Sequence, residues 1–140
     1  MAILEKDLSS EVLNIFRQRG YRIFLEIPVY NRRIDAILLK GKTVYSIEFK
    51  IKNWRKAIIQ IRTHMLIADF AYLCMPYRNK IPEQLEKYLI NYGIGLFLYN
   101  LDLKEIKETI SPRHSFIQQT RLKDNVIRRL TKKGGIYEFT

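Results

Sequence analysis

The spacing of apolar residues predicts a helix followed by three strands in the first fifty residues. Between residues 4 and 20 the apolar positions recur with the period of one helical face, and Gly20 is placed to end the helix. Segments 21–29, 32–40 and 43–51 are rich in apolar and β-branched residues, which is typical of strands. The chain therefore begins with the order αβββ.

The remaining pattern extends this order and ends in a polar segment. The expected elements are a helix over 54–68, a buried strand over 70–76, a helix over 82–93 and a short strand over 94–100. Beyond residue 100 the chain is mostly polar, with one helix predicted near 122–130 and ended by Gly134 and Gly135. We predict a single α/β domain of order αβββαβαβ, with a core over residues 1–100 and a basic C-terminal extension over 101–140.

The strand at 43–51 alternates strictly, so that one of its faces is polar. Glu48 and Lys50 share this face and lie close enough to contact one ligand. The polar face is either a solvated edge or a catalytic site.

The turn before this strand determines which residue faces Glu48. If residues 41–42 form a two-residue type II′ loop, Lys40 pairs with Thr43 and Asp35 lies opposite Glu48. Facing Cβ atoms in an antiparallel pair are about 4.5 to 5.5 Å apart, and like charges at that distance are destabilising without a cation between them. Two carboxylates in this arrangement can hold Mg²⁺, which prefers oxygen ligands. A hairpin loop of another length would change the pairing.

Two alternatives remain open at this position. Lys50 by itself would partly neutralise the two carboxylates and make the group structural. A third carboxylate from the first helix would instead strengthen a metal site. Glu11 lies at one margin of the apolar face and is the preferred candidate, Glu5 lies at the other margin and competes with it, and either can face water.

The charge balance indicates a polyanionic partner. The chain has 25 Lys and Arg against 14 Asp and Glu, a formal net charge of +11, so nucleic acid is the leading candidate. Two segments concentrate the cations, although such runs are also common on solvated faces. The candidate phosphate contacts are Lys52, Arg55, Lys56, Arg121, Lys123, Arg128, Arg129, Lys132 and Lys133.

The remaining composition favours a cytoplasmic protein. Cys74 is the one cysteine of the chain, which excludes an internal disulfide and a cysteine zinc site. No window approaches the roughly 18 apolar residues of a membrane span, so we expect no membrane association by insertion. His64 and His114 are expected to be packed or surface histidines, and Asp69 the end of the second helix.

The helix, the strand "RRIDAIL" with Asp35, the short hairpin and "IEFK" with Glu48 and Lys50 together resemble the PD-(D/E)XK nuclease superfamily, which includes restriction endonucleases and archaeal Holliday junction resolvases. The resemblance covers residues 4–76 and implies a restriction endonuclease-like αβββαβ core, a central mixed β-sheet flanked by helices. Ile34 replaces the proline of the motif's name, which is often absent. Where some branches have a Q-x-x-x-Y pattern, this chain has Gln60 and His64.

The resemblance implies roles for individual residues. Asp35 and Glu48 would bind Mg²⁺, with Mn²⁺ as a substitute, and Glu11 would be the upstream glutamate. Lys50 would orient or activate the attacking water, and Gln60 matches a glutamine of several branches. The implied function is a Mg²⁺-dependent endodeoxyribonuclease, with junctions or flaps among the candidate substrates, and we expect a homodimer because one small domain has little surface to hold two strands. The alternatives are a non-catalytic DNA-binding module with a degenerate nuclease fold, and a basic domain that binds an acidic protein or membrane surface.

Overall fold

A computed structural model describes residues 3–132 and 137–138, and within these residues it contains four helices and six strands. In chain order the elements are α1 (Glu5–Gln18), β1 (Arg22–Val29), β2 (Arg32–Lys40), β3 (Thr43–Phe49), α2 (Trp54–His64), β4 (Phe70–Pro76), α3 (Glu83–Tyr92), β5 (Gly95–Asn100), β6 (Glu105–Ile110) and α4 (Thr120–Leu130). The predicted order αβββαβαβ is confirmed over residues 5–100.

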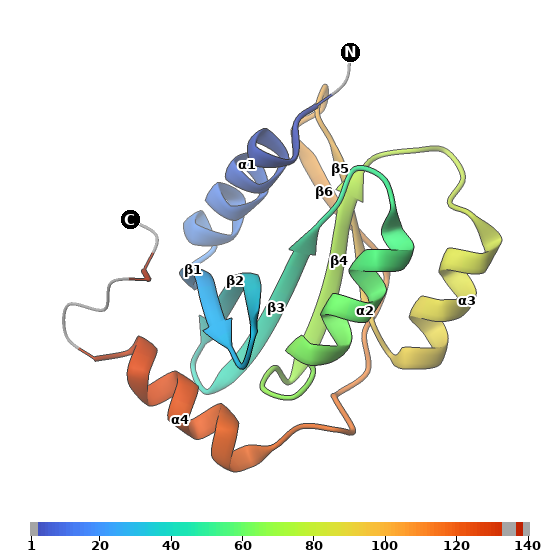
Figure 1. Ribbon diagram of the computed structural model, residues 1–140. Helices are drawn as coiled ribbons and strands as arrows, with labels where there is room; N and C mark the ends of the chain where they lie inside the picture. The colour runs from blue at the N-terminus through green and yellow to red at the C-terminus, as the bar shows by residue number, and fades with distance from the viewer. Residues whose placement is uncertain (1–2, 133–136, 139–140) are drawn as a thin grey trace.

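The six strands form one mixed sheet in the order of the chain (Figure 1). Strands β1, β2 and β3 pair antiparallel, β3, β4 and β5 pair parallel, and β6 returns antiparallel to β5. The two parallel steps each require a crossover, and helices α2 and α3 supply them. The sheet is therefore mixed because hairpins connect its first strands and helices connect its middle strands.

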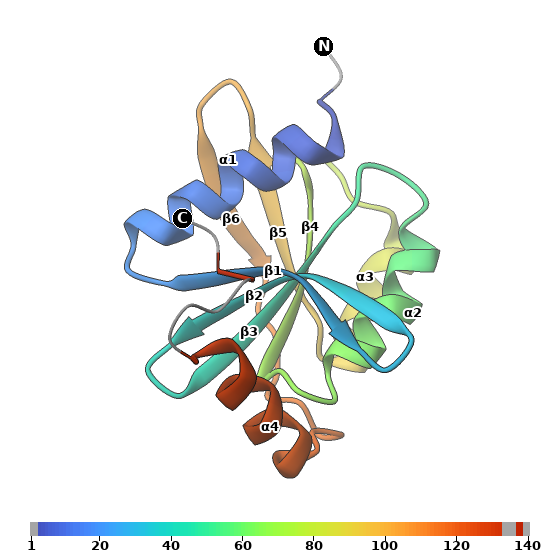
Figure 2. The same ribbon diagram turned by 60° about the vertical axis from the view of Figure 1, so that its left-hand side comes forward.

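Helices cover both faces of the sheet. Helix α1 packs on one face with Leu8, Val12 and Phe16, against side chains such as Ile47 of β3. Helices α2 and α3 pack on the opposite face over β4 and β5, and α4 covers β1 and β2 on that face. Figure 2 shows α1 on one side of the strands and α4 on the other. Each face is thus buried by helices from a different part of the chain.

The β2–β3 hairpin has the predicted register. Lys40 pairs with Thr43, and the pairing continues residue by residue to Ala36 opposite Ile47. Gly41 has a φ of 62°, and Lys42 is not among the residues with positive φ, which fits a type II′ turn. The next positions along the two strands are Asp35 and Glu48, so the expected juxtaposition follows from this turn.

Two elements differ from the expectation. Helix α2 ends at His64 rather than near residue 68, and Asp69 lies in the loop before β4, so the prediction that it ends the helix is wrong. Strand β6 was not predicted, because its segment EIKETI is polar and largely exposed at the sheet edge. The sheet therefore continues beyond residue 100. The predicted glycine break at 134–135 lies outside the described residues.

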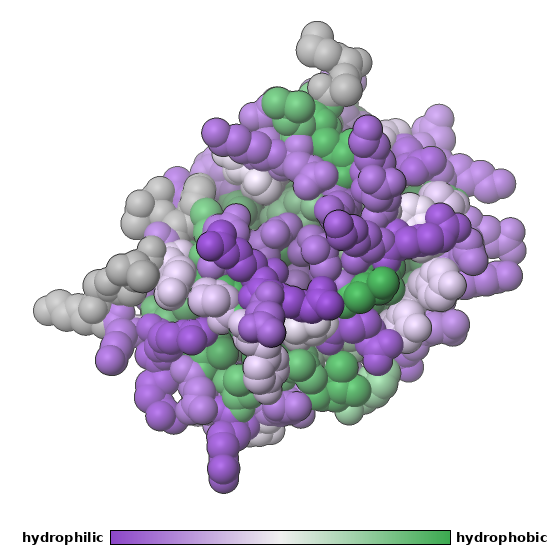
Figure 3. Space-filling model, viewed as in Figure 1, coloured by the Kyte–Doolittle hydropathy of each residue, from purple (hydrophilic) through white to green (hydrophobic). Residues whose placement is uncertain are grey.

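The described surface is mainly polar. Figure 3 shows hydrophilic side chains over most of one face, with apolar groups in separate patches. Within residues 3–132 and 137–138, no helix combines the length and the apolar character needed to cross a membrane.

Candidate metal and nucleic-acid site

Two carboxyl groups meet at the end of the β2–β3 hairpin. Glu48 is 4% exposed, and Asp35 is partly buried beside it. The backbone N–H of Phe49 donates to Asp35 Oδ2 at 3.2 Å, and the Asp35 and Glu48 carboxyls lie close enough to share a hydrogen bond. The alternation of β3 sends Glu48 to the face covered by α2, and the hairpin register brings Asp35 to it.

Burial of this pair raises both pKa values. For Glu48 the loss of solvation is the largest cause and the charge of Asp35 is the next, and together they raise its pKa to about 8. Burial also raises the pKa of Asp35, which the Phe49 N–H opposes and the charge of Glu26 reinforces. In the protein alone, therefore, one proton is retained on the pair at neutral pH.

Lys50 lies next to the pair without forming an ion pair with it. It directly follows β3, where its backbone N–H donates to the carbonyl of Cys74 at 3.0 Å. Its charge lowers the pKa of both carboxyls, but within the described residues no lysine or arginine makes a salt bridge to Asp35 or Glu48. Lys50 therefore does not neutralise the two carboxylates by direct contact.

A hollow of about 390 Å³ opens onto Asp35. Its wall includes Glu5 and Ser9 of α1, Glu26 of β1 and Phe49 of β3. Glu26 was missed by the sequence analysis, because β1 shows no polar alternation at that position. It has a φ of 55° within the strand, an uncommon conformation for a residue other than glycine, and its charge acts on Asp35. The hollow gives solvent access to a carboxylate that β2 otherwise encloses.

The structure does not bring Glu11 to the carboxyl pair, which corrects the preference for it as third carboxylate. Its Oε1 accepts a hydrogen bond from the hydroxyl of Tyr99 at 2.7 Å and forms an ion pair with Lys104 Nζ at 2.8 Å. These partners lower the pKa of Glu11, with Lys104 the largest cause. Glu5, the competing candidate, lines the hollow with Asp35, and its charge contributes to the raised pKa of Glu48.

Gln60 and His64 lie one turn apart on α2. The Oε1 atom of Gln60 is buried and finds no hydrogen-bond partner in the described part of the chain. His64 is 1% exposed, and its Nε2 lies 3.7 Å from Glu48 Oε1. Burial lowers the pKa of His64 to about 3, and the charge of Arg32 acts in the same direction, so the imidazole is neutral. His64 was expected to be packed or at the surface, and it is packed here against Glu48. The helical step of four places Gln60 on the same side of α2 as His64.

The three cations after β3 are exposed. Lys52 lies in the loop before α2, and Arg55 and Lys56 lie in the first turn of the helix. No acidic residue is present in that turn, so the helix dipole disfavours both cations there. Arg55 lies over the Trp54 ring and donates to Gln84 of α3. These exposed cations follow closely in sequence after the strand that carries Glu48.

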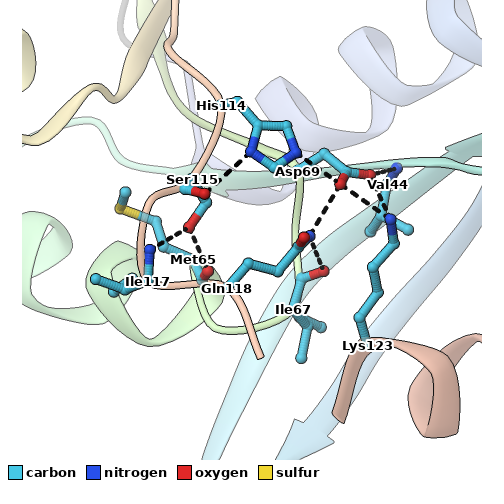
Figure 4. Close-up of polar contacts among 9 residues, drawn as sticks. All are labelled: Val44, Met65, Ile67, Asp69, His114, Ser115, Ile117, Gln118 and Lys123. Atoms are coloured by element: carbon cyan, nitrogen blue, oxygen red, sulfur yellow. Dashed lines mark hydrogen bonds and ion pairs between the residues drawn. The ribbon is translucent and has the colours of Figure 1, made fainter. Parts of the chain in front are cut away.

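The C-terminal segment is attached to the core through Asp69 (Figure 4). Both oxygens of Asp69 accept hydrogen bonds from Lys123 Nζ at 2.9 Å, and Gln118 and His114 also contact Oδ1. The backbone N–H of Val44 donates to Oδ2 at 2.8 Å. Lys123 was predicted to bind nucleic acid; its side chain is 17% exposed and is committed to Asp69. It is therefore a docking residue for α4, which corrects that prediction.

The other cations of this segment differ in their surroundings. Arg121, Arg128 and Lys132 are exposed, whereas Arg129 donates to the carbonyl of Pro28 at 3.0 Å. Lys133 lies outside the described residues. The exposed cations on α4 remain candidates for phosphate contacts, separate from the group on α2.

The donor set at the carboxyl pair suits a hard divalent cation. Carboxylate oxygens are the ligands that Mg²⁺ and Mn²⁺ prefer, and no lysine or arginine among the described residues forms a salt bridge to this pair. Among residues 3–132 and 137–138, no set of three or more His, Cys, Asp or Glu side chains converges on a single point. With only Asp35 and Glu48 as protein ligands, a cation at this site would have to keep several waters, as Mg²⁺ usually does.

The chain is similar in structure to solved proteins, although the comparisons of sequence found no match. No family model matches it, and no curated protein does. Its structure is similar to that of an XisH family protein from Nostoc punctiforme, with a TM-score of 0.59 and 13% identity over 74% of this chain and 98% of that one. AF1548, a protein of unknown function, gives a TM-score of 0.48 and 19% identity over 61% of this chain and 53% of its own. The first likeness shows that this chain shares its mixed α/β fold with the XisH family protein.

Proposed function

We propose that this protein is a Mg²⁺-dependent endodeoxyribonuclease with a restriction endonuclease-like core. The observation that carries the proposal is the buried Asp35–Glu48 pair, in which two carboxyls lie together and no lysine or arginine of the described residues forms a salt bridge to them. A purely structural pair would be expected to have a salt bridge, because removing charges from water without a partner is costly. The adjacent hollow and the exposed cations of α2 supply access and phosphate contacts.

The residues have separate roles in hydrolysis. Asp35 and Glu48 hold the divalent cation through carboxylate oxygens, which requires the pair to lose the proton that it retains in the free protein. When bound, the cation supplies Lewis-acid activation of the phosphate and a lower pKa for a coordinated water. Lys50 orients the attacking water and offsets the negative charge that develops on the phosphate. Gln60 lies on the helix that covers the pair and supports this arrangement; its buried Oε1 has no partner among residues 3–132 and 137–138.

The DNA is held mainly through its backbone. Lys52, Arg55 and Lys56 contact phosphates next to the cut, and the exposed cations of α4 extend the positive surface. Such contacts position a nucleic acid without reading its sequence. A homodimer would supply a second such surface for the other strand.

A cleavage assay tests the proposal directly. Labelled duplex, single-stranded, flap and four-way junction DNA are incubated with the protein in Mg²⁺, Mn²⁺ or EDTA, beside Glu48→Gln and Lys50→Ala variants. We expect metal-dependent cutting that falls about 100-fold or more in each variant, the usual scale for loss of a charge-stabilising group. Glu105→Gln, which removes an exposed carboxylate of β6, is the matched control and should cut like the parent.

The same assay identifies the alternative function. If no substrate is cut while the parent and Glu48→Gln bind DNA equally in both metals, the protein is a DNA-binding module with a degenerate nuclease fold. Failure to prefer DNA over heparin or acidic peptides would exclude both functions.

A further inference from the structure

His64 has an environment that folding alone does not explain. It is 1% exposed, and neither Nδ1 nor Nε2 has a hydrogen-bond partner within the described residues. A buried polar atom without a partner costs about 1 to 3 kcal/mol. An apolar side chain of similar size at this position of α2 would avoid that cost.

The direction of the ring connects it to Glu48. Helix α2 places His64 in its last turn, above the face of β3 from which Glu48 projects. Nε2 and Glu48 Oε1 are 3.7 Å apart, longer than a hydrogen bond, and no other carboxylate is paired with His64 in the described residues. A movement of less than about 1 Å would bring the two atoms to hydrogen-bonding distance.

We propose that His64 is a positioning residue for Glu48. Its neutral imidazole donates a hydrogen bond from Nε2 to Oε1 of Glu48 and so fixes the rotation of the carboxylate. The second carboxylate oxygen of Glu48 is then free to bind the cation together with Asp35. This inference rests on the proposed function, because an orientation of Glu48 matters only if the carboxylate binds a cation. We assign the cation to the carboxylate oxygens and not to His64, because Mg²⁺ and Mn²⁺ prefer oxygen ligands to imidazole nitrogen.

The chemistry of a metal site supports this role. A carboxylate that binds a cation with one oxygen retains a second oxygen, and a hydrogen-bond donor on that oxygen restricts its motion. His64 supplies a single N–H in a buried position where water cannot compete. Loss of such an outer partner typically lowers metal affinity or activity about 10- to 100-fold.

Three substitutions separate positioning from packing. His64→Leu fills the space without a donor, His64→Gln places an amide N–H near the position of Nε2, and His64→Asn places one near Nδ1. For each we would measure Mn²⁺ affinity by calorimetry, thermal unfolding of the metal-free protein, and kcat and KM for cleavage. We expect His64→Leu and His64→Asn to lose about 10- to 100-fold in Mn²⁺ affinity and in kcat, with KM for DNA little changed, and His64→Gln to retain the parent values within a few-fold.

The outcomes are distinguishable from those of the proposed function. If the parent binds no Mn²⁺ and cuts nothing, the proposed function fails and this inference fails with it. If the parent binds and cuts while His64→Leu does so equally well, His64 only fills space and the inference is overturned. If His64→Leu does not fold, the comparison of His64→Gln with His64→Asn decides, because equal Mn²⁺ affinities in those two variants would contradict a donor at Nε2.

Discussion

At the scale of single residues, the buried Asp35–Glu48 pair lowers the stability of the folded protein. Two carboxyls buried together raise the free energy of the folded state at any pH where both would otherwise ionise. Function is the simplest reason to retain such a pair, because perturbed pKa values gather at functional sites. The predictions at this scale concern the two carboxyls and their neighbours.

Glu48→Gln should stabilise the metal-free protein increasingly from about pH 5 to pH 8. The carboxyl of Glu48 has an ordinary pKa of 4.5, which folding raises to about 8, so the folded protein holds a proton that the unfolded chain releases across this window. Stability therefore falls with pH more steeply in the parent than in the variant, in which Asp35 still has a raised pKa, and the difference is on the order of 1 to 3 kcal/mol at pH 8. Urea denaturation in EDTA at pH 5 and pH 8 measures the difference. A gain that is the same at both pH values, or an equal gain in Glu105→Gln, would contradict this account.

Glu11→Gln should leave Mn²⁺ binding within a few-fold of the parent, because Glu11 is engaged by Tyr99 and Lys104 rather than by the carboxyl pair. Asp35→Asn should remove most of the binding, since it takes away one of the two ligands that supply charge. Calorimetric titration of both variants provides the test. Glu5→Gln is the informative companion, because Glu5 lines the hollow beside Asp35.

At the scale of elements, turns and loop contacts decide where the functional side chains lie. The β2–β3 hairpin fixes the register that sets Asp35 beside Glu48, and the Asp69 contacts attach the segment that leads into α4. The hairpin turn depends on Gly41 and the attachment of α4 depends on Asp69, so each feature can be tested by one substitution.

Gly41→Ala should destabilise the fold by about 1 to 2 kcal/mol, the cost of a positive φ for a residue with a Cβ. A Cβ at this position would meet no atom within 4 Å, so strain in the backbone is the expected cause and steric contact is not. Chemical denaturation measures the loss. Lys42→Ala changes the neighbouring turn residue without requiring positive φ and should be close to neutral.

Asp69→Asn should destabilise the protein by about 3 kcal/mol, because it leaves Lys123 partly buried without its counterion. Burial alone would raise the pKa of Asp69, but hydrogen bonds from Val44, Gln118 and Lys123 lower it below its ordinary value. The stability that Asp69 contributes is therefore present above an ordinary Asp pKa and is lost as the pH falls through the lower folded value.

Proteolysis and denaturation together check this prediction. Cleavage within α4 should become faster in Asp69→Asn at pH 7, and the difference in stability between parent and variant should shrink in strong acid. Asp124→Asn, an exposed position on α4, is the control. Unchanged protection of α4 in Asp69→Asn would show that apolar contacts of Val126 and Leu130 hold the helix without the ion pair.

At the scale of the whole molecule, positive charge is distributed over two separate surfaces. The net charge of +11 predicts binding to a polyanion, but it does not say which face binds. Lys52, Arg55 and Lys56 lie just after the strand that carries Glu48, whereas Arg121 and Arg128 lie on α4. Salt dependence can assign the contacts to one surface or to both.

Arg55→Gln with Lys56→Gln should reduce the salt dependence of DNA binding. Each phosphate contact contributes about 0.9 to the slope of log affinity against log salt for duplex DNA, so the pair should lower the slope by about 2. Fluorescence anisotropy between 50 and 200 mM salt in EDTA measures it. Arg78→Gln, an exposed cation in the loop after β4, controls for loss of net charge, and an equal effect there would show that binding is not localised.

Much of the fold was predictable because the spacing of apolar residues along the chain indicates most of its helices and strands. A period of 3.6 in apolar spacing indicates the helices, alternation indicates β3, and continuous apolar runs indicate the buried strands β4 and β5. The two-residue loop at Gly41 determines the hairpin register. Strand β6 was not predictable in this way, because an edge strand with polar side chains owes its conformation to hydrogen bonds with β5. The end of α2 at His64 was also not predictable, because the chain must leave the helix there to reach the start of β4 at Phe70.

The sequence by itself determined the order of elements, the excess of positive charge and the pairing of Asp35 with Glu48 beside Lys50, because each depends on residues close along the chain or joined by one turn. Only the tertiary structure decided that Glu11 contacts Tyr99 and Lys104, that Lys123 contacts Asp69, and that His64 lies against Glu48. These contacts join residues up to 93 positions apart. Packing of helices on the sheet sets such distances, and no local pattern encodes that packing.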